Sequence, residues 1–307
     1  MIFVITGASS FLGKEMINFL LSEGHQVFAV CRPNSKGLTK LPNSENLKIV
    51  LAEMPAYKNL QDQINYADIF INLSWQGTDH DSRNLKDIQE ENIRYSSDAI
   101  YAASKMGCKL FVESGSQAEY GTCLDKITEE TPCAPFSDYG RAKLAIKEKG
   151  FELAEVLDIK YLHLRIFSLF GETDHPWTLI MSCLKKMLVN EQVDLSPCTQ
   201  KWNFLYVKDA VKQICLLIEF ALRNGDFIHE VYNIASGDTR ILKDFVEEMK
   251  ALTMSNSKLN YGVVVPNNIV SLEPVVDKIE NAIHFISDYS FRSVVNNIVK
   301  FLNTKTL

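Results

Sequence analysis

Tyr139 and Lys143 lie four residues apart in the segment Tyr-Gly-Arg-Ala-Lys, a spacing that can perform acid–base chemistry. Residues four apart share one face of a helix, so the lysine ammonium would lie beside the tyrosine hydroxyl. A nearby positive charge favours the phenolate and therefore lowers the tyrosine pKa from its usual value of about 10. A tyrosine tuned in this way can protonate a developing alkoxide or accept a proton from an alcohol. The same spacing occurs by chance in many helices, so its meaning depends on the other segments.

A glycine-rich turn near the N-terminus indicates a dinucleotide site. An apolar run at residues 1–6 precedes it, and an amphipathic stretch at 15–23 and a second apolar run at 26–30 follow. This order of strand, turn, helix and strand is the context that dinucleotide binding requires, with the helix N-terminus facing the pyrophosphate. The residues of the turn that we expect to contact the cofactor are Gly7, Ser9, Ser10, Phe11, Leu12 and Gly13.

The turn at Ser10 and the loop after the second strand both depart from the usual dinucleotide-binding pattern. Ser10 stands where such turns usually have their middle glycine, so its Cβ takes up room beside the phosphates, although its hydroxyl could donate to them or cap the helix. The second strand is followed by Arg32, Ser35 and Lys36 rather than by an acidic residue that would bind the adenosine ribose. These side chains could bind a 2′-phosphate, so we expect NADP(H), with NAD(H) as the alternative. A solvated basic loop is the other interpretation.

The composition excludes several classes of partner. The chain has 307 residues, 46% hydrophobic and 23% charged, with a net charge of −6, which disfavours nucleic acids and anionic membranes. No apolar run approaches the roughly 18 residues of a membrane span, and no signal peptide is evident. The seven cysteines are scattered without a Cys-x-x-Cys pair, and the six histidines have no metal-type spacing. We therefore expect a reduced, cytoplasmic, metal-free protein.

Strand and helix patterns alternate through the first half of the chain, which predicts an α/β fold with a doubly wound parallel sheet. The strands are expected at 46–52, 68–74, 109–114 and 160–167, and the helices at 60–66, 87–106 and 139–157. Functional groups in such sheets gather at the carboxyl ends of the strands. Leu73-Ser74-Trp75 and Ser114-Gly115-Ser116 lie at such ends, and the Ser116 hydroxyl could reach the same substrate oxygen as Tyr139. The alternative for the second segment is a polar turn.

Together these segments resemble the extended short-chain dehydrogenase/reductase family, in its group of nucleotide-sugar epimerases and dehydratases. The resemblance covers nearly the whole chain. It rests on segments 6–13, 111–121, 165–171, 204–209 and 232–237, together with Asn92, Tyr139 and Lys143.

The resemblance implies a Rossmann-type domain at 1–172 and a smaller substrate-binding lobe, mainly at 173–307, with a segment at about 200–235 returning to the first domain. It implies that Tyr139 is the acid/base, that Ser116 binds the reacting oxygen, and that Lys143 holds the nicotinamide ribose. Hydride would pass between the nicotinamide and C4 of a nucleotide-linked sugar. Further cofactor contacts are implied for Glu53, Leu73 and Phe167, in addition to Tyr139 and Lys143. Substrate contacts are implied for Ser74, Gln117, Ser168 and Trp202. A homodimer through the helices at 87–106 and 139–157 is also implied.

Three departures from the family pattern bear on the reaction. Gln117 and Ala118 follow Ser116, where dehydratases of the family carry an acidic pair, so elimination of water is disfavoured. Ser168 and Trp202 replace an asparagine and an arginine of many 4-epimerases. We therefore expect a reductase of a 4-keto-6-deoxy sugar nucleotide. The alternatives are a nucleotide-sugar 4-epimerase with retained NAD and, as a third hypothesis, a non-catalytic dinucleotide-binding sensor.

Overall fold

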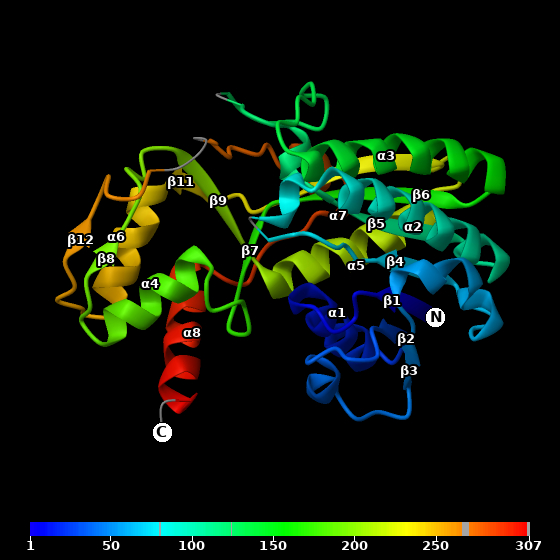
Figure 1. Ribbon diagram of the computed structural model, residues 1–307, viewed down its shortest axis with the longest axis horizontal. Coiled ribbons are helices and arrows are strands. Elements are labelled where there is room, and N and C mark those ends of the chain that lie inside the picture. The colour runs from blue at the N-terminus through cyan, green and yellow to red at the C-terminus, as the bar shows by residue number, and fades with distance from the viewer. Residues whose placement is uncertain (80, 124, 266–269, 306–307) are drawn as a thin grey trace.

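The computed structural model describes residues 1–307 except 80, 124, 266–269 and 306–307. Its larger part is a seven-stranded sheet in which every strand is parallel to its neighbours (Figure 1). The strands, in spatial order, are β10 (His229–Ile234), β6 (Lys160–Ile166), β5 (Leu110–Ser116), β4 (Ile69–Asn72), β1 (Ile2–Thr6), β2 (Gln26–Cys31) and β3 (Leu47–Leu51). The direction of winding changes between β1 and β4, and ligands bind at such a point in doubly wound sheets. The predicted fold class is confirmed.

Apolar residues on both faces of the strands form two cores, as expected for a parallel sheet covered by helices. In β4, Ile69 and Ile71 belong to one core and Phe70 to the other. The first core includes α1 (Phe11–Ser22) and α5 (Val207–Arg223), which pack against each other. The second includes α2 (Lys86–Lys105) and α3 (Asp138–Leu157), which also lie side by side.

Two predicted elements differ from the structure. The helix expected at 60–66 is wrong, because the chain there forms the 3₁₀ segment η2 (Met54–Asp62) instead. Its buried residues Met54, Tyr57 and Leu60 are spaced by three, which matches the three-residue turn of a 3₁₀ helix. The strand expected at 109–114 extends to Ser116, so this serine ends a strand rather than lying in the turn after it.

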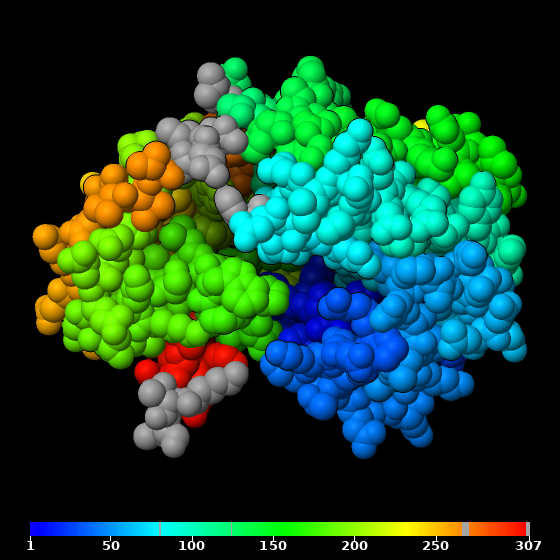
Figure 2. All heavy atoms as spheres, in the orientation of Figure 1, coloured from blue at the N-terminus to red at the C-terminus, as the bar shows by residue number. Residues whose placement is uncertain are grey.

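The smaller lobe contains two short sheets and three helices (Figure 1). One sheet joins β11 (Thr239–Ile241), β9 (Lys201–Tyr206) and β7 (Ser168–Phe170), and the other joins β12 (Leu259–Asn260) and β8 (Val193–Asp194). The helices are α4 (Leu179–Leu188), α6 (Leu242–Leu252) and α8 (Phe291–Lys305). Two helices that lie between these lobe helices in the sequence pack on the large sheet instead. α5 and α7 (Asp277–Ile283) both contact its edge strand β10. Figure 2 shows the surface hollowed between this lobe and the N-terminal residues.

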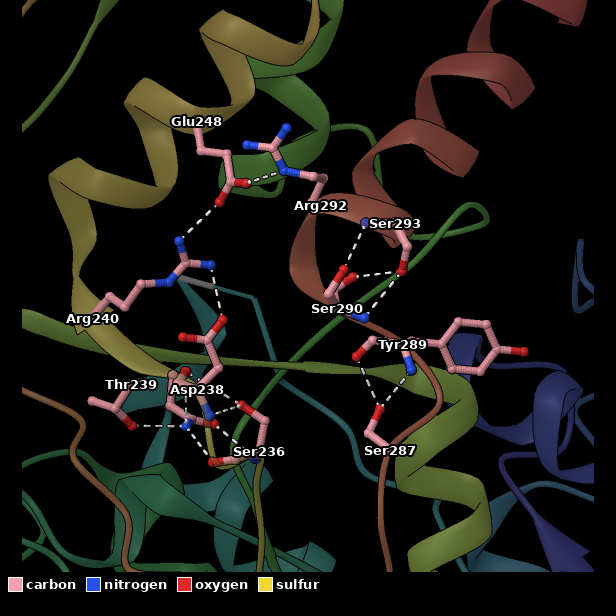
Figure 3. A network of polar contacts seen from close by, with 11 residues as sticks. Ser236, Asp238, Thr239, Arg240, Glu248, Ser287, Tyr289, Ser290, Arg292 and Ser293 are labelled. Carbon is pink, nitrogen blue, oxygen red and sulfur yellow. Dashed lines mark hydrogen bonds and ion pairs between the residues drawn. The ribbon is translucent and has the colours of Figure 1, made fainter.

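Arg240 and Arg292 hold the smaller lobe together through a shared carboxylate (Figure 3). Arg240 donates to Glu248 and to Asp238, each at 2.8 Å, and Arg292 donates to the other oxygen of Glu248 at 3.1 Å. These bonds connect β11, α6 and α8. Both guanidinium groups are therefore already paired with carboxylates.

Candidate active site

The glycine-rich turn between β1 and α1 forms a tight cradle. Gly7 has φ of +63°, and a Cβ there would lie 2.7 Å from the backbone carbon of Leu73. A Cβ on Gly13 would lie 2.5 Å from the carbonyl oxygen of Gly7. Ser10 caps α1, because its Oγ accepts a hydrogen bond from the Gly13 N–H at 3.0 Å. Only glycine fits at the first and last positions, as a turn that brings backbone close to a pyrophosphate requires.

A cavity of about 710 Å³ extends from this turn to the loop after β2. It is lined by the predicted cofactor residues Gly7, Ser9, Ser10, Arg32, Ser35 and Leu73. The hydroxyls of Ser9 and Ser35 are 2.6 Å apart, which joins the turn to the loop. The structure does not bring Lys36 or Glu53 to this wall; Met54 and Tyr57 line it instead. These walls fit a dinucleotide whose phosphates lie over the turn and whose adenosine lies beside Arg32.

A second cavity, of about 410 Å³, adjoins the first and shares Ser10, Leu73 and Trp75 with it. It brings together predicted residues from four parts of the chain, namely Phe11, Leu12, Ser116, Gln117, Tyr139, Lys143, Phe167 and Ser168. Two predicted substrate residues lie elsewhere. Ser74 lines the cofactor cavity, where its hydroxyl is 2.6 Å from that of Tyr57. Trp202 packs against Phe204 in the lobe.

Tyr139 lies in the first turn of α3 and is only 8% exposed. Ser137 caps the N-terminus of this helix, because its Oγ accepts a hydrogen bond from the Gly140 N–H at 3.0 Å. Burial raises the Tyr139 pKa, and a hydrogen bond with Ser116 and the positive charge of Arg83 oppose that effect. The expectation of a lowered pKa is therefore wrong for this structure. The phenol is protonated at neutral pH.

The closest partners of the Lys143 ammonium are groups other than Tyr139. Its Nζ donates to the Ser114 carbonyl at 2.5 Å, lies 3.5 Å from the Trp75 ring centroid, and is 3.8 Å from Glu113 Oε1. The Tyr139 ring centroid is 6.0 Å away. Burial lowers the Lys143 pKa to about 8, although Glu113 favours the charged form.

A buried ionic cluster fixes Ser116. The Ser116 N–H donates to Glu119 Oε1 at 2.8 Å, and the Ser116 hydroxyl accepts from the Ala118 N–H, which together form a capping box. Glu119 also accepts from Arg165 Nε at 2.9 Å and lies 2.9 Å from His163 Nε2. Burial raises the pKa of Glu119, but His163 and Arg165 outweigh it and lower that pKa to about 2. Glu119 is therefore a permanent anion with no role as a proton donor.

The loop after β4 contributes residues that sequence reasoning missed. Trp75, Thr78 and Arg83 line the second cavity, which is the candidate catalytic cavity, and so does His175 from the segment after β7. Trp75 directly follows Leu73 and Ser74 at a strand end, so its position gave a signal. Nothing in the sequence distinguishes Arg83 from other surface arginines.

The described part of the chain has no group of three or more His, Cys, Asp or Glu side chains arranged to hold a metal ion. All seven cysteines are free thiols. Within the same residues no helix has the length and apolar content needed to cross a membrane.

A family model described as the NAD dependent epimerase/dehydratase family matches residues 3–235. The chain belongs to this family. It is an enzyme of the nucleotide-sugar branch that the sequence resemblance indicated, and that prediction is confirmed.

Known epimerase/dehydratase family members resemble the chain along most of its length. CDP-abequose synthase from Salmonella muenchen is 25% identical over 85% of this chain and 84% of its own. The dTDP-6-deoxy-L-talose 4-dehydrogenase (NAD(+)) of Aggregatibacter actinomycetemcomitans is 26% identical over 85% of this chain and 93% of its own. Among solved structures, the UDP-glucuronic acid 4-epimerase of Bacillus cereus in complex with UDP-glucuronic acid and NAD has a TM-score of 0.84. Its identity is 16%, over 99% of this chain and 100% of its own. This last likeness supports the fold.

Proposed function

We propose that this enzyme reduces the C4 keto group of a nucleotide-linked 6-deoxy sugar. The observation that carries the proposal is that Ser116, Tyr139 and Lys143 line one cavity, which adjoins a glycine-walled dinucleotide cavity. A bound nicotinamide dinucleotide would supply the hydride. Reduction of the carbonyl to an alcohol then needs one proton on the oxygen.

Tyr139 supplies that proton in the proposed reaction. Burial raises its pKa and keeps the phenol protonated, which is the state a proton donor needs. The Ser116 hydroxyl, fixed at the end of β5, donates a hydrogen bond to the same carbonyl oxygen and so orients it. Lys143 lines the smaller cavity, with its Nζ over the ring of Trp75, which lines both cavities, and it would bind the ribose hydroxyls of the dinucleotide.

Elimination of water is disfavoured by the environment of Ser116. Gln117 and Ala118 carry no acid, and the nearest carboxylate, Glu119, is buried in a hydrogen bond with His163 and an ion pair with Arg165. The name of one relative specifies a dehydrogenase acting at position 4 of a dTDP-6-deoxy sugar, which supports chemistry at that carbon.

The preference for NADP(H) over NAD(H) is part of the proposal. Arg32 and Ser35 line the adenosine end of the cavity and could bind a 2′-phosphate. We also propose a homodimer through α2 and α3, a cytoplasmic location, and a domain division near residue 172. Light scattering of the purified protein tests the dimer.

A nucleotide-sugar 4-epimerase with retained NAD is the second candidate, favoured by solved neighbours such as the Bacillus cereus 4-epimerase. Incubating the enzyme with 4-keto-6-deoxy hexoses linked to CDP or dTDP, with NADPH deuterated at nicotinamide C4, separates the two. Reduction consumes one NADPH for each alcohol and places deuterium at sugar C4. Interconversion of two 4-hydroxy sugars without net loss of dinucleotide would reject the reductase. Tyr139→Phe should lose most turnover and keep cofactor affinity in either case.

A further inference from the structure

Arg83 lies against Tyr139 in the catalytic cavity. It belongs to the short segment η3 (Ser82–Asn84), and its guanidinium carbon is 4.5 Å from the Tyr139 ring centroid. Both side chains line the cavity that also contains Ser116. A guanidinium over the face of a tyrosine is attracted by the ring, and the attraction strengthens when the pair is partly shielded from water.

The position of Arg83 is set by helix α2. Gln89 Nε2 donates to the carbonyls of Gly77 and Ser82, at 2.9 and 3.2 Å, and its Oε1 accepts from the Trp75 indole at 2.8 Å. Asn92 holds the backbone of Gln76 through both its N–H and its carbonyl. These bonds attach the loop that carries Arg83 to a long helix.

The same loop is also attached to the helix that carries Tyr139. The side chain of Asn84 accepts a hydrogen bond from the Asp138 N–H at 3.3 Å. Arg83 is therefore held between two helices rather than on a free loop.

No carboxylate among the described residues balances the charge of Arg83. Within the residues that the structure describes, no ion pair of Arg83 is found, and its buried Nε has no hydrogen-bond partner. By contrast, the ammonium of Lys143 is directed at Ser114 and Glu113.

Other charged groups near Tyr139 are engaged within their own clusters. On the short segment η4 (Gln117–Glu119), Glu119 is hydrogen-bonded to His163 and ion-paired with Arg165; on α3, Asp138 is paired with Arg141 at 2.5 Å. On the loop after β4, the Asp79 carboxylate accepts the N–H groups of Asp81 and Ser82. Arg83 is thus the cation whose field acts on the phenol most directly.

We propose that Arg83 is the positioning residue for Tyr139, holding its ring and supplying the positive charge that stabilises the phenolate formed when the proton leaves. The part of this role that concerns catalysis rests on the proposed function, because the buried Tyr139 becomes an anion only when it donates its proton. Lys143, which interacts with Glu113, then remains available for the cofactor.

The first test measures Tyr139 without any substrate. 3-Fluorotyrosine is introduced at position 139, which lowers the phenol pKa into the range where the protein stays folded, and its ¹⁹F signal is followed against pH. Arg83→Gln should move the titration to higher pH, and Arg83→Lys should keep it near the wild-type midpoint. Arg94→Gln is the matched control, since Arg94 lies over the Tyr95 ring at 4.8 Å on α2 but does not line the cavity. A titration of Arg83→Gln that coincides with wild type would overturn the inference.

The second test uses turnover. Arg83→Gln should lower kcat for reduction about tenfold, with the cofactor dissociation constant unchanged, and Arg83→Lys should restore most of the rate. Equal rates in Arg83→Gln and wild type would also overturn the inference. If wild type does not reduce the keto sugars but the fluorotyrosine titration shifts as expected, the proposed function fails and the role of Arg83 stands.

Discussion

Lys143 Nζ lies 3.8 Å from Glu113 Oε1, and both side chains are almost completely excluded from solvent. The other Glu113 oxygen accepts a hydrogen bond from Asn72 Nδ2 at 2.8 Å, whereas Oε1 has no hydrogen-bond partner within the described residues. Burial raises the pKa of Glu113 to about 7 and lowers that of Lys143 to about 8. Burial therefore disfavours the charged forms of both groups, and this pair links the stability of the protein to pH.

Glu113→Gln should remove a fall in stability between about pH 4.5 and 7. The folded carboxyl titrates near 7 and the unfolded one near 4.5, so the folded state binds the extra proton and stability falls as the pH rises between these values. The loss in wild type is at most about 3 kcal/mol. Urea unfolding at several pH values measures it.

Lys143 gives the stability of the protein the opposite dependence on pH. Its folded pKa of about 8 lies below its usual 10.5, so the unfolded state binds more protons between these values and stability rises with pH there. The contribution of this pair to stability should accordingly be lowest between about pH 7 and 8. An unchanged slope below pH 7 in Glu113→Gln would show that Glu113 does not titrate there.

Glu119→Gln should destabilise the protein by about 3–5 kcal/mol at pH 7, because it leaves the buried Arg165 without its anion. The folded pKa of Glu119 is about 2, below its usual 4.5, so its contribution is complete above pH 4.5 and is lost as the pH falls toward 2. Differential scanning calorimetry detects the change. Glu91→Gln is the control, since its ion pair with Arg94 is half exposed and contributes less than about 1 kcal/mol. Similar melting temperatures for the two variants would contradict the prediction.

Much of the fold could be predicted because buried parallel strands have continuous apolar sequences and helices have a different period. The cofactor turn could be predicted as well, since Gly7 and Gly13 have no room for a side chain. The exact direction of the Lys143 side chain could not be predicted from the sequence. A spacing of four places two residues on one helix face, but where a long ammonium chain ends depends on a carboxylate that another segment supplies, here Glu113.

The loop from Trp75 to Arg83 shows a second limit of sequence reasoning. Gln89 and Asn92 on the following helix form hydrogen bonds with Trp75, Gln76 and Gly77 of this loop. No sequence pattern around Gln89 or Asn92 predicts these bonds. The roles that we propose for Ser116 and Tyr139 rest on short motifs in the sequence. The cation beside Tyr139 comes from tertiary contacts, so it is visible only in the structure.

Gly13→Ala should abolish dinucleotide binding and destabilise the protein by about 1–3 kcal/mol. The new Cβ would lie 2.5 Å from the Gly7 carbonyl oxygen and 2.8 Å from that of Ala8, so α1 must move away from the turn. Quenching of tryptophan fluorescence on titration with NADPH measures the binding. Gly225→Ala is the matched control, because a Cβ there meets nothing within 4 Å. Normal NADPH affinity in Gly13→Ala would mean that the turn does not hold the phosphates.

Arg32→Gln should lower kcat/KM for NADPH by roughly 10- to 100-fold and leave that for NADH nearly unchanged. A charge-assisted hydrogen bond to a 2′-phosphate contributes about 1.5–3 kcal/mol, and NADH lacks that group. Lys36→Gln should have a smaller effect, since Lys36 is exposed and does not line the cavity as Arg32 does. Steady-state kinetics with both dinucleotides at two salt concentrations decides the matter, because screening weakens a phosphate contact at this exposed site. If wild type prefers NADH and Arg32→Gln changes neither value, Arg32 belongs to a solvated loop and the cofactor is NAD(H).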